Sequence, residues 1–364
     1  MQSTLRAIGR QQSLNLQIVA TGMHLDPAHG DGLQSIKDAG WHIDRVVPWD
    51  SNSGRDRKTT ARNTGLAVAA IADALAELQS DIVLVVGDRV EAFAAASAAH
   101  LSGLVIAHVH GGDRAAGQVD DCLRHAISKL AHVHFPATRQ SAHRLRKLGE
   151  DRWRIHLAGS PGLDGIVADS APWDRVQEAM GELHPRKYAL LVLHPAEADE
   201  SVEAERARLV LAAALGVPFE RIVIIYPNND PGAAGIIRVW DGLSDPRIIA
   251  RRDLKRPVYL GLLRDAAVLL GNSSSGIIEA ASFGTPVIDI GPRQNGRERG
   301  ANVMHSPYDR DRLTAHMLRI WNEGRPRRYK SGNIYGRGSA GQFIAGVLAN
   351  LPLAEKLLRK LISY

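Results

Sequence analysis

The chain of 364 residues has a single cysteine, Cys122, few aromatic residues and no long apolar run. One cysteine cannot form an internal disulfide, which suits a reducing compartment, so we expect a cytoplasmic protein. No apolar stretch approaches the roughly 20 residues of a membrane helix. The N-terminus, MQSTLRAIGRQQS, also lacks the apolar core of a signal peptide. We therefore expect no membrane partner.

Charge of one sign is not concentrated in any segment. The net charge is +6, and a basic balance favours an anionic partner, either a nucleic acid or a small phosphorylated ligand. Aromatic residues make up only 5% of the chain and do not alternate with the basic ones as in nucleic-acid-binding surfaces. We therefore expect no nucleic-acid partner and favour the small phosphorylated ligand.

The first half alternates short β-branched runs with longer amphipathic stretches. Continuous apolar strands separated by helices are typical of a parallel sheet covered on both faces. Helices are predicted at 64–79 and 141–150. The predicted strands lie at 16–22, 81–88, 103–112, 131–135 and 154–162.

A second series of the same kind follows. Its strands are predicted at 188–195, 221–227, 246–250, 266–272 and 285–291, and its helices at 200–216, 257–265 and 275–283. A chain of this length favours two domains. The segment 164–186 has no strand signal, so we place domains at 1–165 and 166–364, with the last helix a candidate to pack back onto the first. We predict two Rossmann-like doubly wound α/β domains, with the active site in the cleft between them.

The segment GNSSSGIIEAASFGTPVIDIG (271–291) predicts a phosphate site in the second domain. A strand runs into a helix start whose free N–H and hydroxyl groups suit a phosphate, through Asn272, Ser273, Ser274, Ser275 and Gly276. Gly276 would let the backbone approach the ligand, and Glu279 could accept hydrogen bonds from a ribose diol. The alternative is an ordinary serine-capped helix. The next loop supplies Arg293 and Arg297 for the same phosphates.

Acidic residues follow the predicted strands of the first domain. Asp88, Asp113 and Asp120 come from three loops at one edge of the sheet. Carboxylates in one cleft repel one another and split their pKa values, which provides a base and an acid near neutral pH. The alternative for Asp120 and its neighbour Asp121 is helix capping alone.

The histidines of this region do not have metal-ligand spacing. His108 and His110 alternate along a strand and point to opposite faces, so they cannot easily share an ion. His132 and His134 repeat that arrangement and are predicted to be packed in the core. We expect neither a metal nor a cofactor.

Six segments together carry a resemblance to a known family. They are TGMHL (21–25), GDRVE (87–91), HVHGGD with VDDCLRHAISKLAHVHF (108–135), AGSPGLD (158–164), YPNNDPG (226–232) and GNSSSGIIEAASFGTPVIDIGPRQNGR (271–297). In this order, over nearly the whole chain, they closely resemble the hydrolysing UDP-N-acetylglucosamine 2-epimerases of sialic-acid-type biosynthesis. The resemblance implies the glycosyltransferase-B architecture, a nucleotide-sugar substrate and a homo-oligomer, dimer or tetramer.

The resemblance also implies a reaction and residue roles. UDP would leave the sugar through a 2-acetamidoglucal, and hydration would give N-acetylmannosamine and free UDP. Asp88, Asp113 and Asp120 match the catalytic acidic positions, and His194 is a candidate acid for the leaving group. The expected substrate-binding residues are His24, Arg89, His110, Asp121, Asn272, Ser273, Ser274, Ser275, Gly276, Glu279, Arg293 and Arg297.

Two departures leave alternatives open. The family usually has Glu where this chain has Asp113, a side chain one methylene shorter. STLRAIGRQQ (3–12) resembles the end of the family's first helix, so we expect the first N-terminal strand and its arginine loop to be missing. A UDP- or a GDP-linked substrate, a glycosyltransferase of the same architecture and a catalytically weak nucleotide-sugar-binding homologue all remain open.

Overall fold

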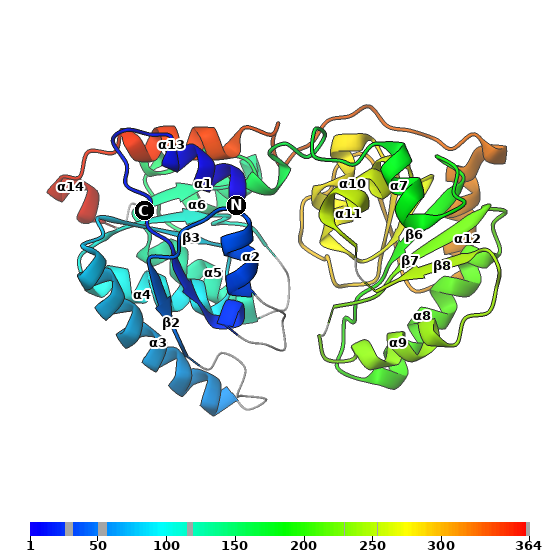
Figure 1. Ribbon diagram of the computed structural model, residues 1–364, viewed down its shortest axis with the longest axis horizontal. Coiled ribbons are helices and arrows are strands. Elements are labelled where there is room, and N and C mark those ends of the chain that lie inside the picture. The colour runs from blue at the N-terminus through cyan, green and yellow to red at the C-terminus, as the bar shows by residue number, and fades with distance from the viewer. Residues whose placement is uncertain (26–31, 50–56, 115–118, 229, 253, 362–364) are drawn as a thin grey trace. The chain divides into compact units, whose positions relative to one another are not determined.

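The computed structural model describes residues 1–25, 32–49, 57–114, 119–228, 230–252 and 254–361, except the side chains of residues 23, 57, 119 and 120. The chain forms two compact units, Met1–Asp164 with Ser339–Tyr364, and Gly165–Gly338. Both are Rossmann-like α/β domains. The second unit ends at Gly338 rather than at residue 364, because the chain returns to the first unit for its last helices (Figure 1).

The described part of the first unit holds two separate parallel sheets. One pairs β1 (Val19–Thr21) with β2 (Arg45–Val47), and the other has the order β3 (Ile82–Val86), β4 (Val105–Val109), β5 (Val133–Phe135). All five residues of β4 are buried, as expected of a strand covered on both faces.

Helices cover both faces of the three-stranded sheet. Ile106 packs on one face in the cluster that includes residues of α3, α4 and α5, whereas Val105 and Phe135 pack on the other with residues of α1 and α13. α1 and α13 lie side by side (Figure 1), and a Cβ on Gly341 would meet the Thr4 backbone at 2.7 Å. The helices of this unit are α1 (Gln2–Gly9), η1 (Gly22–Leu25), α2 (Gly32–Asp38), α3 (Arg57–Leu78), α4 (Val90–Leu101), α5 (Val119–Leu130), α6 (Arg139–Lys147), η3 (Arg152–Arg154), η4 (Pro161–Leu163), α13 (Ala340–Ala349) and α14 (Glu355–Leu358).

The C-terminal segment is held to the rest of the first unit by two buried cationic side chains, Arg154, which donates to the carbonyls of Lys356, Leu357 and Arg359, and Lys360. Lys360 donates to the carbonyls of Ser128, Lys129 and Ala131 and pairs with Glu150 at 2.6 Å. Burial lowers the pKa of Lys360 to about 8 although Glu150 opposes the shift. Carbonyls at the end of α5 lack intrahelical partners, so the ammonium group satisfies acceptors that would otherwise be left open.

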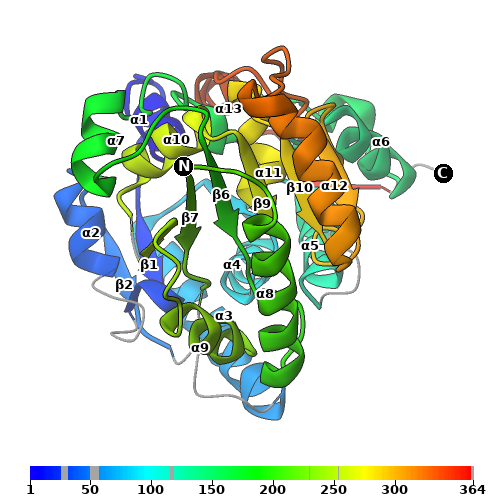
Figure 2. The same cartoon turned by 90° about the vertical axis from the view of Figure 1, so that its right-hand side faces the viewer.

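The second unit is built on one continuous parallel sheet (Figure 2). Its order is β11 (Val303–Ser306), β10 (Val287–Ile290), β9 (Val268–Gly271), β6 (Tyr188–Val192), β7 (Arg221–Ile225), β8 (Ile248–Arg251). The chain builds outward from β6 through β7 to β8, and then begins again at β9 on the other side. The strand order therefore reverses between β6 and β9, the place where open α/β sheets bind ligands.

Alternating side chains of β6 give the second unit a core on each face. Leu191 packs with residues of α8, α9 and α12, and Leu190 packs against the other face with residues of α7, α10 and η5. These helices are α7 (Trp173–Met180), α8 (Glu200–Leu215), α9 (Ala233–Asp241), α10 (Arg256–Asp265), η5 (Ala280–Phe283) and α12 (Arg310–Trp321), and the remaining two are α11 (Ser274–Ile278) and η6 (Asn322–Gly324).

All but one of the predicted strands are confirmed. The exception is 154–162, where an isolated bridge from Ile155 to His134 replaces a strand because 3-10 turns precede and follow it. The sequence analysis missed β2 and β11, which are short and partly exposed.

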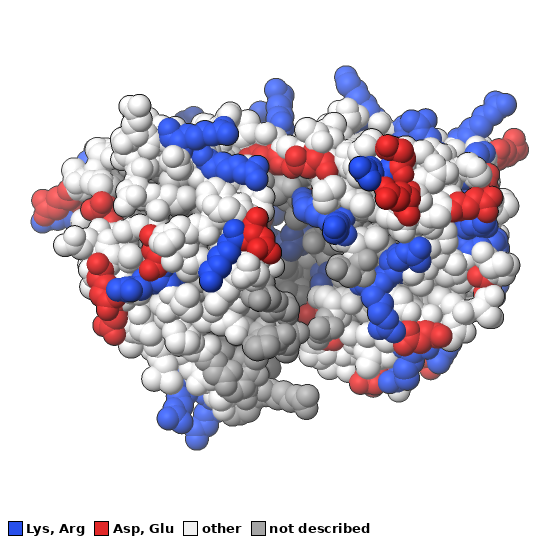
Figure 3. Space-filling model, viewed as in Figure 1, with Lys and Arg blue, Asp and Glu red and all other residues white. Residues whose placement is uncertain are grey.

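None of the helices in the described ranges is long and apolar enough to cross a membrane. On the face of each unit seen in Figure 3, basic and acidic side chains are interspersed.

Candidate functional site

At the carboxyl edge of the three-stranded sheet in the first unit, one arginine forms ion pairs with two aspartates. Asp88 follows β3 after Gly87 and pairs with Arg124 of α5, whose guanidinium also lies 3.1 Å from Asp121 Oδ1. The Arg124 side chain is only 5% exposed, whereas those of Asp88 and Asp121 are 22% and 20% exposed. One buried cation therefore orients two carboxylates that water can still reach.

Arg124 was not among the predicted site residues. Its spacing of three residues from Asp121 on a helix is a local signal for a pair. Its contact with Asp88 depends on α5 packing beside the end of β3, and the spacing of residues along the sequence does not predict that packing. Asp120 lies one residue earlier in α5, but its side chain is outside the described residues, so its proposed catalytic role stays a prediction.

Asp113 lies in a separate buried network. Its Oδ2 is 2.9 Å from His110 Nδ1, and its Oδ1 accepts a 2.7 Å hydrogen bond from Ser141. His110 Nε2 in turn lies 3.2 Å from Ser160 Oγ. Both carboxylate oxygens thus have partners, and Asp113 is held as part of a chain that runs to the loop before η4.

The second of the two glycines between His110 and Asp113 is required by close packing. Gly112 has φ +77°, and a Cβ there would come within 2.3 Å of the Ser141 carbonyl oxygen. The turn after β4 can therefore press against α6, which brings Ser141 within reach of Asp113.

The other histidines of this region belong to the core. His132 and His134 are buried, as predicted. His108 is also buried, with Nε2 2.8 Å from the Gly87 carbonyl and Nδ1 3.2 Å from Ser128 Oγ. Burial lowers the pKa of His108 to about 3, so this ring is neutral at physiological pH.

Two further predicted residues lie at exposed positions of the first unit. His24 is exposed in η1, directly after β1. Arg89 is the residue before α4, 62% exposed, with Nε 3.6 Å from Glu91 Oε2. Both follow strand ends and are accessible, so they are available to a ligand at this edge.

In the second unit, the point of strand reversal is closed by a reciprocal amide contact. The fully buried Asn272, after β9, accepts a hydrogen bond from His194 N–H and donates to the His194 carbonyl, each at 2.8 Å. The loops after β6 and β9 are thereby locked together.

The His194 ring is uncharged at physiological pH. Burial, together with the positive charge of Arg293, lowers its pKa to about 4. Its Nδ1 lies 3.2 Å from the Asn228 backbone nitrogen and 3.1 Å from Asn228 Oδ1, so the loop after β7 holds the ring in place. The ring is therefore held in position after β6 and is neutral at physiological pH.

The serine loop has an internal hydrogen-bond chain. Ser273 caps α11 by accepting from Ser275 N–H, and the two hydroxyls lie 3.0 Å apart. Tyr259 of α10 makes a short hydrogen bond to the Ser275 hydroxyl. Ser274, the first residue of α11, is partly exposed. The capping alternative is therefore realised by Ser273, while the loop keeps partly exposed hydroxyls.

Gly276 has a packing role that was not predicted. It is buried, and a Cβ there would lie 2.8 Å from Leu269 Cδ2 and 2.9 Å from Val287 Cγ1. Those side chains belong to β9 and β10. Glycine is therefore needed for α11 to pack on the sheet, and the approach of its backbone to a ligand stays a prediction.

Basic residues surround the serine loop. Arg293 donates to the Asn272 carbonyl at 3.1 Å and lies 3.6 Å from Asp230, and burial together with neighbouring Arg297 lowers its pKa. Glu279, expected to meet a ribose, accepts a 2.8 Å hydrogen bond from Arg256. The loop thus joins hydroxyls and guanidinium groups, which suits an anionic ligand.

Within the described residues, no three His, Cys, Asp or Glu side chains are grouped so that they could hold a metal ion. The polar groups of both units are instead organised by arginine and asparagine.

A family profile described as UDP-N-acetylglucosamine 2-epimerase matches residues 6–349. The chain is 34% identical, over 368 aligned positions, to the UDP-N,N'-diacetylbacillosamine 2-epimerase (hydrolyzing) of Legionella pneumophila, covering 100% of this chain and 96% of that protein. It is 32% identical to a UDP-N-acetylglucosamine 2-epimerase of Neisseria meningitidis, over 84% of this chain and 79% of the relative.

The fold is similar to that of solved structures. The crystal structure of UDP-GlcNAc 2-epimerase from Neisseria meningitidis bound to UDP-GlcNAc superposes with a TM-score of 0.80 at 17% identity. The superposition covers 96% of this chain and 95% of that one. The architecture is therefore of the glycosyltransferase-B type, with two Rossmann-like domains.

Proposed function

Because the chain belongs to the UDP-N-acetylglucosamine 2-epimerase family, we propose that it is a hydrolysing nucleotide-sugar 2-epimerase. It converts UDP-GlcNAc, or a UDP- or GDP-linked relative, to a sugar of the N-acetylmannosamine type and free nucleotide. The observation that carries this proposal is the partly exposed carboxylate of Asp88, which the buried Arg124 orients while also pairing with Asp121. A 2-epimerase must move a proton at a carbon atom, and positioned carboxylates are suited to that task.

The first stage is an elimination. A carboxylate of the set Asp88, Asp113 and Asp120 removes the C2 proton, and the C2–H electron pair forms a double bond between C1 and C2. The C1–O bond breaks, and its electron pair leaves with the nucleoside diphosphate. Since the C2 proton is weakly acidic, most of the stabilisation has to come from binding the departing diphosphate.

The second unit supplies groups for that leaving diphosphate. Arg293 and Arg297 offer cationic donors, Ser274 and Ser275 offer hydroxyls, and His194 offers its imidazole ring. The pKa of His194 is about 4 in the free protein, and a nearby diphosphate would raise it because an anion favours the charged ring. A larger fraction of the His194 rings would then carry the extra proton that the leaving diphosphate can accept.

The second stage is a hydration. A water oxygen bonds to C1 and loses a proton, while C2 takes a proton from an acid on the face opposite to the first abstraction. One water molecule is consumed, and the products are the 2-epimeric free sugar and the nucleoside diphosphate. Two acids on opposite faces of the ring are needed, and the family resemblance assigns Asp113 and Asp120 to the catalytic positions together with Asp88.

The substrate class remains broader than one sugar. The similarity to the Legionella enzyme supports a diacetamido sugar as one candidate. The side chain of Asp113 is anchored by Ser141 and His110, and it is one methylene shorter than the glutamate that the resemblance leads us to expect, which leaves more room beside the ring. We infer a cytoplasmic homo-oligomer that supplies precursors of sialic-acid-type sugars.

The purified protein should be incubated in deuterated water with UDP-GlcNAc, GDP-GlcNAc and UDP-N,N'-diacetylbacillosamine. We expect free nucleotide and a 2-epimerised sugar with one deuterium at C2 from at least one of them. Transfer of the sugar to an acceptor without deuterium at C2 would identify a glycosyltransferase. Tight nucleotide binding with no turnover of any substrate would identify a binding protein.

Variants connect this test to named residues. Asp88→Asn and Asp120→Asn should each remove deuterium incorporation while nucleotide binding persists. If both variants kept full activity, the catalytic assignment would be wrong. Asp241→Asn is a matched control, because Asp241 is an exposed partner of Tyr226 and Arg252 in the second unit.

A further inference from the structure

His110 occupies a strained backbone position at the carboxyl edge of the first unit. It directly follows β4 and has φ +67°, a left-handed conformation that glycine adopts without strain. Among the described residues, five non-glycines have a positive φ, and His110 is the one of them that directly follows a strand. The chain therefore keeps an imidazole where the backbone favours glycine, which indicates that the ring itself has a task.

The imidazole ring of His110 is held at both of its nitrogens. Nδ1 lies 2.9 Å from Asp113 Oδ2, and Nε2 lies 3.2 Å from Ser160 Oγ. The Ser141 hydroxyl donates to the second oxygen of Asp113 at 2.7 Å, so the carboxylate is itself fixed. The order carboxylate, imidazole, hydroxyl is the one in which an acid orients a histidine for proton transfer.

The carboxylate determines which nitrogen of the neutral His110 ring carries the proton. An ionised carboxylate only accepts hydrogen bonds, so the proton between Nδ1 and Asp113 Oδ2 belongs to Nδ1. Nε2 then presents its lone pair, and the Ser160 hydroxyl donates to it. This contact is the longer of the two, so Nε2 is the nitrogen that can exchange its partner for a substrate.

The ring is also the most accessible group of the three. The His110 side chain is 19% exposed, against 11% for that of Asp113, and Ser160 is buried. The Gly87 N–H donates to the carbonyl of the last residue of β4, so Asp88 and His110 leave neighbouring strands at the same end. Asp113 is therefore better placed to hold the ring than to reach a substrate.

The charged and titratable groups around the ring come from three elements. His108 of β4 is neutral, because burial lowers its pKa to about 3. Arg144 of α6 is directed to the turn, where it donates to the Gly112 carbonyl at 3.0 Å. Asp113, in that turn, is in direct contact with the ring and would balance the charge of an imidazolium ion at His110.

We propose that His110 is the catalytic base of the first unit that removes the C2 proton, and that Asp113 is its positioning residue. The inference rests on the proposed function and sharpens its set of acids, because Asp113 then acts through His110. In the elimination, Nε2 takes the C2 proton, the C2–H electron pair forms the double bond to C1, and the C1–O electron pair leaves with the diphosphate. The imidazolium ion formed beside Asp113 returns its proton to solvent, and Asp88 or Asp120 remains for protonation of the opposite face.

The first test removes the ring and the backbone strain together. His110→Gly should fold and should lose turnover of the accepted nucleotide sugar by at least about 100-fold, as for loss of a general base. Added imidazole should restore turnover in proportion to its concentration, and the restored rate should rise with pH as the added imidazole loses its extra proton. Pyrazole, a ring of the same size and much lower basicity, is the matched additive and should restore nothing. Asp88→Asn, which leaves no ring-shaped space, should respond to neither.

Further variants keep the test decisive if His110→Gly is unstable. His110→Asn places a residue that tolerates the left-handed conformation, so it should fold, lose turnover to the same extent and bind free nucleotide within about twofold of the parent. Asp113→Asn should lower kcat by at least about 100-fold, because an amide that donates to Nδ1 reverses the ring tautomer. The ¹⁵N shifts of the ring report that reversal, which a merely structural role of Asp113 would not require. Ser160→Ala should change turnover by less than about threefold, since its hydroxyl is only the exchangeable partner of Nε2.

The outcomes separate this inference from the proposed function. No turnover by the parent chain would overturn both. An active parent whose His110 variants keep full turnover overturns the role of His110 alone. A loss that imidazole does not restore, or that pyrazole restores equally, also overturns it, because the ring would then only fill space. Complete loss in Ser160→Ala overturns it as well, since the serine would then be the reacting group.

Discussion

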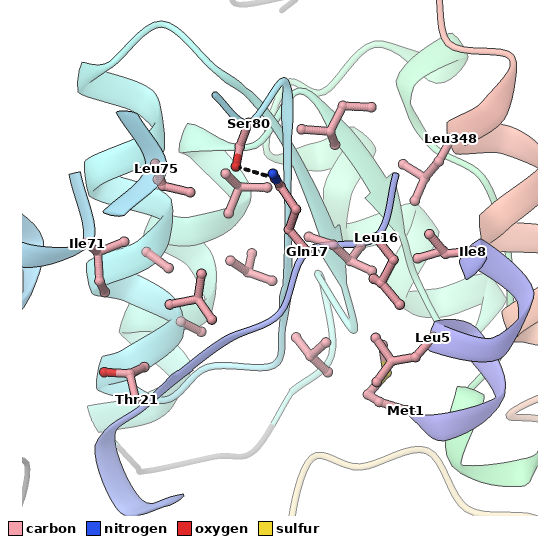
Figure 4. A pocket seen from close by; sticks show the side chains of 18 of the residues that line it. Met1, Leu5, Ile8, Leu16, Gln17, Thr21, Ile71, Leu75, Ser80 and Leu348 are labelled. Atoms are coloured by element: carbon pink, nitrogen blue, oxygen red, sulfur yellow. Dashed lines mark hydrogen bonds between the residues drawn. The ribbon is translucent and has the colours of Figure 1, made fainter. Parts of the chain in front are cut away.

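Both units are parallel sheets flanked by helices, yet they differ at the point where the strand order reverses. In the second unit β6 and β9 are directly paired there, and the loops that follow them are joined by the reciprocal bonds of His194 and Asn272. In the first unit a cavity of about 520 Å³ separates β1 from β3 (Figure 4). Among the described residues, the point of reversal is thus bridged by hydrogen bonds in the second unit and left unpaired in the first.

The two units also position the polar side chains of the candidate site by different contacts. The second unit positions its polar groups through backbone contacts between neighbouring strand ends. The first unit positions Asp88 through Arg124, which comes from a helix rather than from an adjacent strand. We therefore expect the second unit to be the more stable of the two and the first to depend more on side-chain ion pairs.

The largest expected effect concerns the first unit alone. Asp88→Asn should reduce turnover of the accepted nucleotide sugar by about 10³-fold, within the range for loss of a positioned acid–base group. Steady-state kinetics measure the loss, and calorimetry with the free nucleotide should show an affinity within twofold of the parent. If nucleotide affinity fell together with turnover, Asp88 would be a binding group and the division of roles between the units would be lost.

The next effect compares the two sheets directly. Leu190→Ala, in the fully buried β6, should lower the free energy of unfolding of its unit by about 3 kcal/mol, as for other buried leucines. Leu84→Ala, in β3 beside the cavity, should cost only about 1 kcal/mol, because this side chain is already partly exposed and loses fewer contacts. Hydrogen exchange of β6 and β4 amides distinguishes the two units. Equal losses would contradict the contrast between a filled and an open sheet.

A smaller effect is expected at the phosphate-binding loop. Arg293→Ala should weaken nucleotide binding by about 10- to 100-fold, since hydrogen bonds to charged groups contribute about 1.5–3 kcal/mol. Arg293→Lys should recover part of the affinity. Arg252→Ala, which removes an exposed ion pair with Asp241, is the control and should leave binding unchanged. Calorimetric titration with the nucleoside diphosphate measures all three, and an unaffected Arg293→Ala would remove this residue from the site.

The smallest effect is a pH dependence of the first unit. His108 has a pKa of about 3 in the folded protein and near 6.5 when unfolded, so between these values only the unfolded chain binds the proton. The free energy of unfolding should therefore fall as pH decreases below about 6.5, by up to about 1.4 kcal/mol per pH unit for such a group.

Urea unfolding between pH 5 and 8 measures this slope. His108→Asn should be less stable at pH 7.5 but should show a smaller slope, because one of the groups that take up a proton on unfolding is gone. His143→Asn, at an exposed position, should leave the slope of the parent. An unchanged slope in His108→Asn would mean that other buried groups, such as His132, produce the whole dependence.

Much of the fold was predictable because its signals are local. Apolar β-branched runs and their spacing identified nine of the strands, but Arg45–Val47 and Val303–Ser306 were missed because they are short and only partly buried. At the site, residues that follow strands were found, since parallel strands end at one edge. Partners such as Arg124 and Tyr259 were not predicted. Each reaches the site from a helix, and the local sequence pattern does not show how that helix packs.

The sequence by itself determined the alternation of strands and helices, the order of the polar loops and the family. Each of these depends on patterns among residues that are close together in the chain. Only the tertiary structure decided that Arg124 joins Asp88 to Asp121, that Gly276 is needed for helix packing, and that β1 and β3 lie apart. Those features depend on which distant elements become neighbours. Sheet order and helix packing determine that, through the burial of apolar faces and the pairing of backbone groups.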